Sequence, residues 1–334
     1  MSRLTVDEAV GQLLIIGFEG KRYSYKLEQF YRKYRPAGLI LFSRNIESIK
    51  QTEALTTDLA KMGADISGRP LLLAIDEEGG RVSRLSPDMP KFLSAREIGI
   101  EGDANDVVTQ YRAIANFLVS IGLNLDFAPV LDINSNKKNS VIGDRAFSSN
   151  KDLVAILGRA AIVGLREGKV LACAKHFIGH GGTLLDSHYT LPHDSRDKEL
   201  ILEDSAPFQE AINEGLNFLM PAHVIYDQID KRFPATFSEI ILKDYLRDKF
   251  QYKNIVISDD LHMDAILNHY EPDNVARLAF KAGIDMLLIC HNEQYISKIF
   301  NAAKEGIDSG DIDETSVLAS MLRVEQALSK LPQP

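Results

Sequence analysis

Residues 175 to 188 contain the side chains that general acid-base chemistry needs. The segment reads Lys-His-Phe-Ile-Gly-His-Gly-Gly-Thr-Leu-Leu-Asp-Ser-His, and its three glycines allow a tight turn or motion. Asp186 and His188 lie two residues apart, so in an extended stretch both side chains leave the same face and the carboxylate can hold one imidazole nitrogen. Such a pair can exchange a proton near neutral pH. An isolated Asp-x-His pattern more often indicates only a loop histidine that is salt-bridged to its neighbour.

The adjacent acids Asp259 and Asp260 are a second candidate, because they end the apolar run that starts at Asn254. Two adjacent carboxylates repel each other and are commonly directed differently. We expect one to face the mouth of the fold, where it can act as a nucleophile, and the other to cap the following helix. Taken alone, the Ser-Asp-Asp pattern favours the alternative, in which both acids only cap the start of a helix.

Acids and arginines also gather around a glycine turn between Ile75 and Arg84, and a similar group surrounds Arg145. Carboxylates and guanidinium groups make paired hydrogen bonds to vicinal sugar hydroxyls and to amide groups. These segments therefore indicate a binding site, with a solvated charged turn as the alternative.

The elements that must position these residues follow from apolar runs of buried-strand character, separated by stretches of helical spacing. Continuous apolar runs are typical of a parallel sheet that is covered on both faces. Five helices are expected at residues 46–62, 104–121, 151–167, 204–215 and 238–250, and two terminal helices at 293–306 and 314–329. The eight expected strands are 13–17, 38–42, 71–76, 123–129, 170–176, 217–223, 254–259 and 285–291.

Eight strands alternating with helices favour a (β/α)8 TIM-type barrel of the α/β class over an open sheet. We expect one domain over residues 1–334, with the helices at about 293–330 packed on the barrel. In this architecture the active site lies at the carboxyl ends of the strands. Ionisable residues stand at several of those ends, at positions 76, 126, 175, 176, 223, 259 and 291.

Composition excludes several classes of protein. The chain has 334 residues, a net charge of -9 and no low-complexity tract, which argues against a protein that neutralises nucleic-acid phosphates. No secretory signal or membrane span is recognisable, so a cytoplasmic protein is expected. Cys173 and Cys290 lie in apolar runs and are expected to be small core residues.

Metal-site and other nucleophile signatures are missing. There is no His-Glu-x-x-His, no cysteine pair at zinc spacing, no Gly-x-Ser-x-Gly and no phosphate-binding glycine loop. The sequence therefore predicts no metal and no cofactor.

Several motifs resemble, in order, those of glycoside hydrolase family 3, and the likeness is greatest to its single-domain bacterial β-N-acetylglucosaminidases of cell-wall recycling. The likeness runs from about Gly11 to His291. The motifs are Asp76-x-Glu78-Gly-Gly-Arg81, Gly143-Asp-Arg145-x-Phe147, Lys175-His176-Phe-x-Gly-His180-Gly with Asp186-Ser-His188, Met220-x-Ala-His223 and Ser258-Asp259.

The resemblance implies a (β/α)8 barrel and retaining hydrolysis of terminal β-linked N-acetylglucosamine without a cofactor. It implies Asp259 as the nucleophile, His188 as the acid/base and Asp186 as the partner that orients His188. The residues that it implies for holding the sugar are Asp76, Arg84, Arg145, Lys175 and His176.

Two positions depart from the family pattern. Glu77 replaces the usual glutamine and is expected to add negative charge near the sugar site, while Ile178 replaces a common proline and is expected to change how the loop folds back.

Further expectations concern substrate and partners. The expected partner is a small carbohydrate that contains N-acetylglucosamine, such as a peptidoglycan-derived muropeptide, with no nucleic acid and no membrane. The chain is expected to be a monomer or a weak oligomer. The alternatives are a β-glycosidase or phosphorylase of the same family with another sugar, a catalytically silent sugar-binding protein, and a metal-dependent barrel hydrolase.

Overall fold

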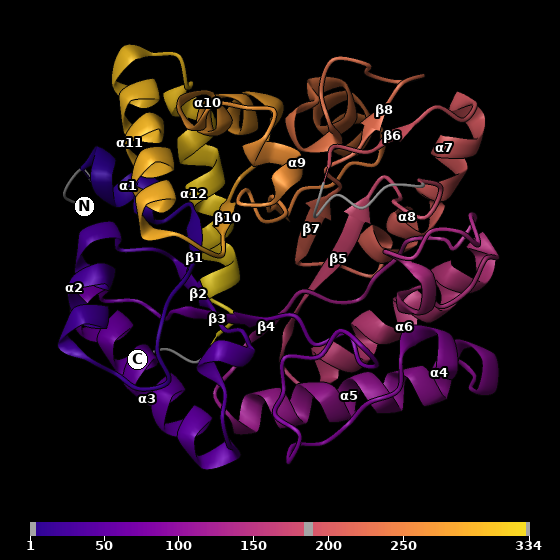
Figure 1. Cartoon of the computed structure of the whole chain (residues 1–334), viewed down its shortest axis with the longest axis horizontal. Coiled ribbons are helices and arrows are strands. Elements are labelled where there is room, and N and C mark those ends of the chain that lie inside the picture. Colours follow the sequence, from indigo (N-terminus) through magenta and orange to yellow (C-terminus); the bar gives the residue numbers. More distant parts are fainter. Residues whose placement is uncertain (1–4, 184–189, 332–334) are drawn as a thin grey trace.

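A computed structural model describes residues 5–183 and 190–331. Its main sheet has eight strands in the order β10-β1-β2-β3-β4-β5-β7-β9, and every pairing between them is parallel. The helices lie outside these strands (Figure 1). The strands are β1 (Leu14–Gly17), β2 (Gly38–Ile40), β3 (Leu72–Ile75), β4 (Leu125–Asp126), β5 (Leu171–Phe177), β7 (Phe218–Pro221), β9 (Ile255–Val256) and β10 (Leu287–Ile289).

The sheet closes between its first and last strands. Ile257 forms a parallel bridge with Met286, and the Ser258 N–H donates to the Met286 carbonyl over 2.9 Å. All residues of the eight strands are buried, as continuous apolar runs require. The predicted (β/α)8 barrel is confirmed, and each expected apolar run overlaps one of its strands.

Twelve α-helices are present in the described part of the chain, and their ends follow local signals. The helix expected at 46–62 instead starts after Ser48, whose hydroxyl accepts the Gln51 N–H, and it ends at Gly68 with φ of +67°. The helices are α1 (Val6–Gly11), α2 (Tyr25–Tyr34), α3 (Ile49–Ser67), α4 (Ala95–Glu101), α5 (Ala104–Ser120), α6 (Lys151–Glu167), α7 (Lys198–Asp204), α8 (Ala206–Asn213), α9 (Asp264–Leu267), α10 (Pro272–Ala282), α11 (Glu293–Ser309) and α12 (Glu314–Leu328).

Two expected helices differ in detail. The helix expected at 204–215 is α8, which is preceded by the separate helix α7, and Pro207 stands in the first turn of α8. The helix expected at 238–250 is the π-helix η4 (Ile240–Lys249). Short segments complete the chain: β6 (His193–Asp194), β8 (Ile225–Tyr226), η1 (Ser43–Asn45), η2 (Gly143–Arg145) and η3 (Ala235–Phe237).

One hydrophobic core runs through the barrel and its covering helices. It includes strand residues such as Ile15 and Leu219 together with Ile299 of α11 and Val324 of α12, so the two terminal helices share the core of the barrel. Both cysteines are free and buried, as expected for small core residues. Within residues 5–183 and 190–331, no helix is long and apolar enough to cross a lipid bilayer.

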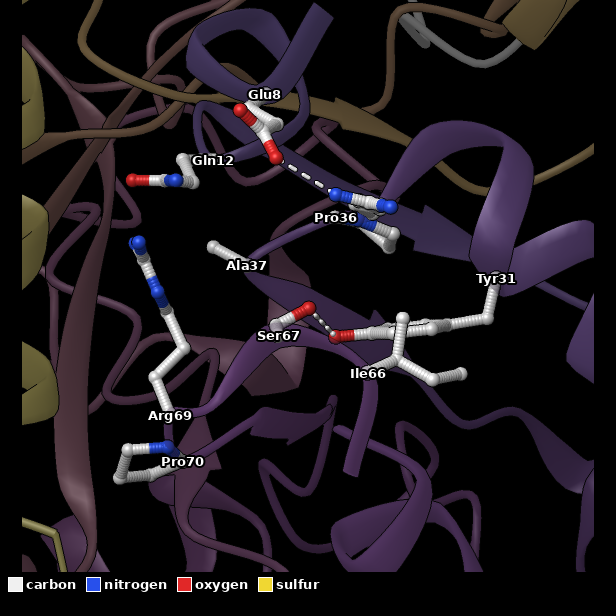
Figure 2. A pocket seen from close by; sticks show the side chains of 10 residues that line it. Glu8, Gln12, Tyr31, Pro36, Ala37, Ile66, Ser67, Arg69 and Pro70 are labelled. Carbon is white, nitrogen blue, oxygen red and sulfur yellow. Dashed lines mark hydrogen bonds and ion pairs between the residues drawn. The ribbon is translucent and has the colours of Figure 1, made fainter. Parts of the chain in front are cut away.

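A small pocket of about 110 Å³ lies at the amino-terminal ends of the first strands (Figure 2). Gln12 and Ala37 on its wall come just before β1 and β2. An ion pair of 2.7 Å between Glu8 and Arg35 also lies on the wall. None of the catalytic or binding residues predicted from the sequence lines this pocket. The predicted site is therefore sought at the carboxyl ends of the strands.

Candidate active site

A cavity of about 560 Å³ opens at the carboxyl ends of the strands and brings six predicted site residues together. This volume lies within the range of small-molecule sites, roughly 300–1,000 Å³. Asp186 and His188, the predicted acid/base pair, lie outside the described residues. The predicted residues on the cavity wall are Asp76, Arg84, Arg145, Lys175, His176 and Asp259.

Lys175 of β5 joins two acids that follow β3. Its Nζ lies 2.8 Å from Oδ1 of Asp76 and 2.7 Å from Oε1 of Glu78. Burial lowers the pKa of Lys175, but the charges of Asp76 and Glu78 outweigh burial and hold this pKa above its ordinary value. The ammonium group is therefore charged throughout the neutral range, fixed at the floor of the cavity.

Arg145 forms a two-point ion pair with Glu78. Its Nε donates to Oε2 over 2.7 Å and its Nη2 to Oε1 over 2.9 Å, and both side chains are buried. Burial raises the pKa of Glu78, but Arg145 and Lys175 outweigh this and lower it strongly. Glu78 belongs to the motif from residue 76 to 81 but was not among the predicted binding residues, although its place two residues after Asp76 puts both side chains on one face.

Arg84 closes the same side of the cavity. Its Nη2 lies 3.3 Å from Oδ2 of Asp76, and its guanidinium group stands over the ring of Phe42 at 5.3 Å. Burial raises the pKa of Asp76, yet Lys175 and Arg84 together lower it below the ordinary value. The Asp76 carboxylate is thus charged and held from two sides.

His176 is oriented by Asp132, a residue that sequence reasoning missed. Oδ2 of Asp132 lies 2.7 Å from Nδ1 of His176, and its Oδ1 accepts the His180 N–H over 2.6 Å. Burial raises the pKa of Asp132, but His176 and these hydrogen bonds lower it overall. Because a carboxylate only accepts, Nδ1 carries the hydrogen and Nε2 faces Nη2 of Arg145 at 3.4 Å. Only the position of Asp132 shortly after β4 could have suggested it.

Asp259 follows β9 and lines the cavity. Burial raises its pKa, but His223, His176, the Asp260 N–H and Lys175 more than offset burial and bring the pKa to about 2. The Asp260 N–H donates to Oδ1 of Asp259 over 2.7 Å. The carboxylate of Asp259 is therefore ionised at neutral pH, as a nucleophile must be.

Asp260 is directed to backbone groups. Its Oδ1 accepts the N–H of Cys290 over 2.9 Å and that of His262 over 3.0 Å. Burial raises its pKa to about 6 in spite of these hydrogen bonds. The expected helix cap is not formed, because Met263 is the N-cap residue of α9 and no side chain caps that helix. Asp260 instead ties the strand end to the segment after β10 and to the turn before α9.

The site can bind the hydroxyl groups of a ligand and can supply a nucleophile. Asp76, Arg145 and Lys175 present fixed charged groups that can hydrogen-bond vicinal hydroxyls, and Asp259 presents an ionised carboxylate to the same space. No three His, Cys, Asp or Glu side chains in the described ranges are arranged to hold a metal ion.

Curated relatives match most of the chain. The chain is 35% identical over 301 residues to "Beta-hexosaminidase" of Thioalkalivibrio sulfidiphilus, and the aligned region covers 88% of this chain and 85% of that protein. It is also 37% identical over 289 residues to "Beta-hexosaminidase" of Methylococcus capsulatus, and the aligned region covers 85% of this chain and 84% of that protein.

Solved structures share the fold. A glycoside hydrolase family 3 beta-N-acetylglucosaminidase from Paenibacillus superposes with a TM-score of 0.95 and 34% sequence identity. The superposition covers 98% of this chain but only 63% of that chain, so this chain spans less than two thirds of its length. NagZ from Neisseria gonorrhoeae, solved in complex with N-trifluoroacetyl-D-glucosamine, gives a TM-score of 0.78 and 29% identity over 95% of this chain and 98% of that chain.

A family model confirms the resemblance that the motifs predicted. Residues 5–327 match the model described as "Glycosyl hydrolase family 3 N terminal domain". This match spans nearly the whole chain and contains every predicted site residue. The chain therefore belongs to glycoside hydrolase family 3.

Proposed function

We propose that this chain is a retaining β-N-acetylhexosaminidase that removes terminal, non-reducing β-linked N-acetylglucosamine. One observation carries the proposal: the ionised carboxylate of Asp259 opens into the same cavity as the charged groups of Asp76, Arg145 and Lys175. A nucleophile and a set of hydroxyl-binding groups in one space are what retaining glycoside hydrolysis requires.

The relatives support the choice of sugar. Two curated relatives carry the name "Beta-hexosaminidase", and the Paenibacillus structure is described as a beta-N-acetylglucosaminidase. The Neisseria structure holds N-trifluoroacetyl-D-glucosamine, an N-acylated glucosamine. We extend the same sugar class to this chain.

In the first step of the proposed reaction, an oxygen of the Asp259 carboxylate attacks the anomeric carbon. The bond from that carbon to the glycosidic oxygen breaks, and the leaving oxygen takes a proton from His188, which Asp186 orients. In the second step, water gives a proton to the neutral imidazole and its oxygen displaces Asp259, which regenerates the enzyme with retained configuration. An imidazole can take both roles because its unperturbed pKa of about 6.5 lies near neutral pH.

Asp76, Arg84, Arg145, Lys175 and His176 are proposed to hold the sugar. Each lines the cavity, and all five make ion pairs or hydrogen bonds that fix their direction before a ligand arrives. Preorganised polar groups lose little freedom on binding, which favours affinity.

The wider setting is also a proposal. We propose that one barrel domain acts in the cytoplasm on muropeptides derived from peptidoglycan, without nucleic-acid or membrane partners. A monomer or weak oligomer is sufficient, because all the proposed sugar-binding residues come from one chain.

Covalent trapping tests the assignment. A slow fluorinated N-acetylglucosaminide should accumulate the glycosyl ester, and mapping of the labelled peptide should find the sugar on Asp259. The same reagent should leave Asp259→Asn unlabelled. A label on Asp260, or a chain that binds N-acetylglucosamine and never releases nitrophenol from its nitrophenyl glycoside, would contradict the proposal.

A further inference from the structure

His291 stands at the rim of the active-site cavity, in the segment that follows β10. It lines the cavity and is exposed, whereas Arg145, Lys175 and His176 on the same wall are buried. The sequence placed an ionisable residue at this strand end, but the proposed reaction gives His291 no role. Its imidazole ring is therefore available to a ligand at the outer level of the cavity.

Arg44 fixes the hydrogen of this ring on one nitrogen. Nη1 of Arg44 lies 3.2 Å from Nδ1 of His291. A guanidinium group has donors only, so Nδ1 accepts and the hydrogen of the neutral ring lies on Nε2. Because Arg44 sets this tautomer, the ring presents a donor at Nε2 before a substrate arrives.

Arg44 is itself held in place by the strand ends around it. Its Nε donates to the Phe18 carbonyl over 3.1 Å, and its Nη2 donates to the Cys290 carbonyl over 2.7 Å. Glu19 adds an ion pair of 3.1 Å to the same guanidinium group. The partner of His291 is thus fixed to the segments that follow β1 and β10, so the direction of its N–H groups does not depend on a ligand.

The free donor is Nε2 of His291. This nitrogen has no hydrogen-bond partner within residues 5–183 and 190–331. A second hydrogen on the ring would place Nδ1–H against an N–H group of Arg44, and burial together with the charge of Arg44 lowers the pKa of His291. The rings of Phe42 and His262 flank it with centroids at 5.2 Å and 6.0 Å. His291 therefore offers one neutral N–H at the rim.

The order of burial in the cavity indicates which part of a substrate meets this donor. An enzyme that removes a terminal sugar admits the non-reducing end first, so the sugar hydroxyls reach the buried charged groups of Arg145 and Lys175. The aglycone, which is the part of the substrate that leaves, then points toward solvent. The exposed ring of His291 lies at this outer level.

We propose that His291 is a specificity-determining residue that donates a hydrogen bond from Nε2 to an oxygen of the aglycone. This inference rests on the proposed function, because it concerns the substrate of the same cavity. A donor of this kind discriminates against substrates that lack the acceptor. It favours an aglycone that is a second sugar, whose hydroxyl and ring oxygens lie near the scissile bond. Arg44 is a positioning residue that acts through His291.

Two glycosides of N-acetylglucosamine test the proposal. Di-N-acetylchitobiose has a second sugar as its aglycone, whereas the methyl β-glycoside has an alkyl group without further acceptors, and both release an alcohol. His291→Phe keeps an aromatic ring but removes the donor. It should lower kcat/KM for the disaccharide about fivefold to tenfold more than kcat/KM for the methyl glycoside, which is the size of one neutral hydrogen bond.

Two further variants serve as controls. His291→Gln keeps an N–H donor at the end of its side chain, so it should restore most of the preference for the disaccharide. His269→Phe changes an exposed histidine that does not line the cavity, so the ratio of the two kcat/KM values should stay as in the unmodified protein. An unchanged ratio in His291→Phe would overturn the proposal, since an equal loss on both glycosides would place His291 at the N-acetylglucosamine unit that they share.

Nitrogen NMR provides a readout that does not depend on catalysis. With labelled histidine rings, the signals that disappear in His291→Phe should show a hydrogen on Nε2 and none on Nδ1. In Arg44→Met the donor to Nδ1 is lost, so the two tautomers should mix and the two nitrogen shifts should approach each other. The same variant should lose part of the preference for the disaccharide. A hydrogen on Nδ1 in the unmodified protein would overturn the proposal.

These outcomes separate the inference from the proposed function. If the unmodified protein cleaves both glycosides and the ratio does not change in His291→Phe, the proposed function stands and the role of His291 is wrong. If the tautomer is as expected but neither glycoside is cleaved, the proposed function fails, and the role of His291 fails with it.

Discussion

Asp259 and Asp260 are chemically identical neighbours that the fold treats in opposite ways. Burial raises the pKa of both, but His223, His176 and Lys175 bring Asp259 down to about 2 while Asp260 stays near 6. Both acids line the cavity, but two backbone N–H groups from other segments hold the Asp260 carboxyl. Environment alone therefore distinguishes the proposed nucleophile from a structural acid.

Neutral substitution of each acid should separate these roles. We expect Asp259→Asn to lower kcat by at least about 10³-fold, because the amide cannot form the ester. Asp260→Asn keeps an oxygen that accepts the Cys290 and His262 N–H groups, so kcat should fall less than about tenfold. Steady-state hydrolysis of a nitrophenyl N-acetylglucosaminide measures both, and comparable losses would contradict the separation.

Lys175 is the cation shared by Asp76 and Glu78 at the floor of the cavity. Lys175→Met should lower the free energy of unfolding by about 3 kcal/mol, because it leaves buried carboxylates without this partner. Urea denaturation measures this loss, and KM for the glycoside should rise in the same variant.

The matched control is Lys151→Met. Lys151 pairs with Glu203 at 2.7 Å, but both side chains are largely exposed, so solvent replaces the interaction and no measurable loss is expected. Equal losses in the two lysine variants would mean that burial of the Lys175 pair does not matter.

At the scale of elements, the close approach of α5 and α6 depends on a glycine. A Cβ on Gly164 of α6 would lie 2.6 Å from the Val108 carbonyl oxygen and 2.9 Å from the Arg112 nitrogen, both in the α5 backbone. Helix α6 also packs against β5, and helix propensity alone would prefer alanine at this position.

Gly164→Ala should therefore destabilise the protein although alanine favours a helix. We expect a net loss of about 1–2 kcal/mol, as overpacking outweighs a propensity gain of about 1 kcal/mol. The comparison is Gly306→Ala on α11, where the new Cβ would meet only side-chain atoms, Cδ1 of Ile312 at 2.6 Å and Cγ of Arg277 at 3.4 Å, and these side chains can move. Chemical denaturation that ranks Gly306→Ala as the worse change would refute this packing argument.

At the scale of the whole molecule, Asp285 connects the end of the barrel to its covering helices. Its Oδ2 accepts from Arg247 of η4 over 2.6 Å and from the Val256 N–H over 2.8 Å. Its Oδ1 accepts from Ser320 and Arg323 of α12, each over 2.7 Å. One buried carboxylate thus joins β9, η4 and the last helix next to the seam where the sheet closes.

Asp285→Asn should weaken the whole fold. The amide brings a nitrogen where an oxygen accepted hydrogen bonds and removes the charge that two arginines share, so we expect a loss of about 3–5 kcal/mol in the free energy of unfolding. Glu167→Gln is the control, because its pair with Arg112, at 3.2 Å, lies between two largely exposed side chains. Denaturation curves that coincide for the two variants would contradict a role of Asp285 in closing the fold.

The sequence predicted the elements because burial leaves a local pattern. All eight apolar runs overlap barrel strands, and their order along the chain was enough to predict the barrel. Helices were less predictable, since α7 precedes the helix expected at 204–215 and was not expected, and η4 is a π-helix. Helix ends depend on capping interactions and local hydrogen bonds of small energy, and the spacing of apolar residues contains no information on these.

By itself, the sequence determined which residues stand at strand ends and hence that Asp76, Lys175 and Asp259 face one space. The tertiary structure alone decided their partners: Lys175 meets Asp76 across 99 residues of chain, and Asp132 holds His176 across 44. It also decided that Glu77 turns away from the cavity into the wall. The physical reason is that a chain pattern encodes burial and direction, whereas contacts between distant residues and the pKa values that depend on them exist only after the barrel closes.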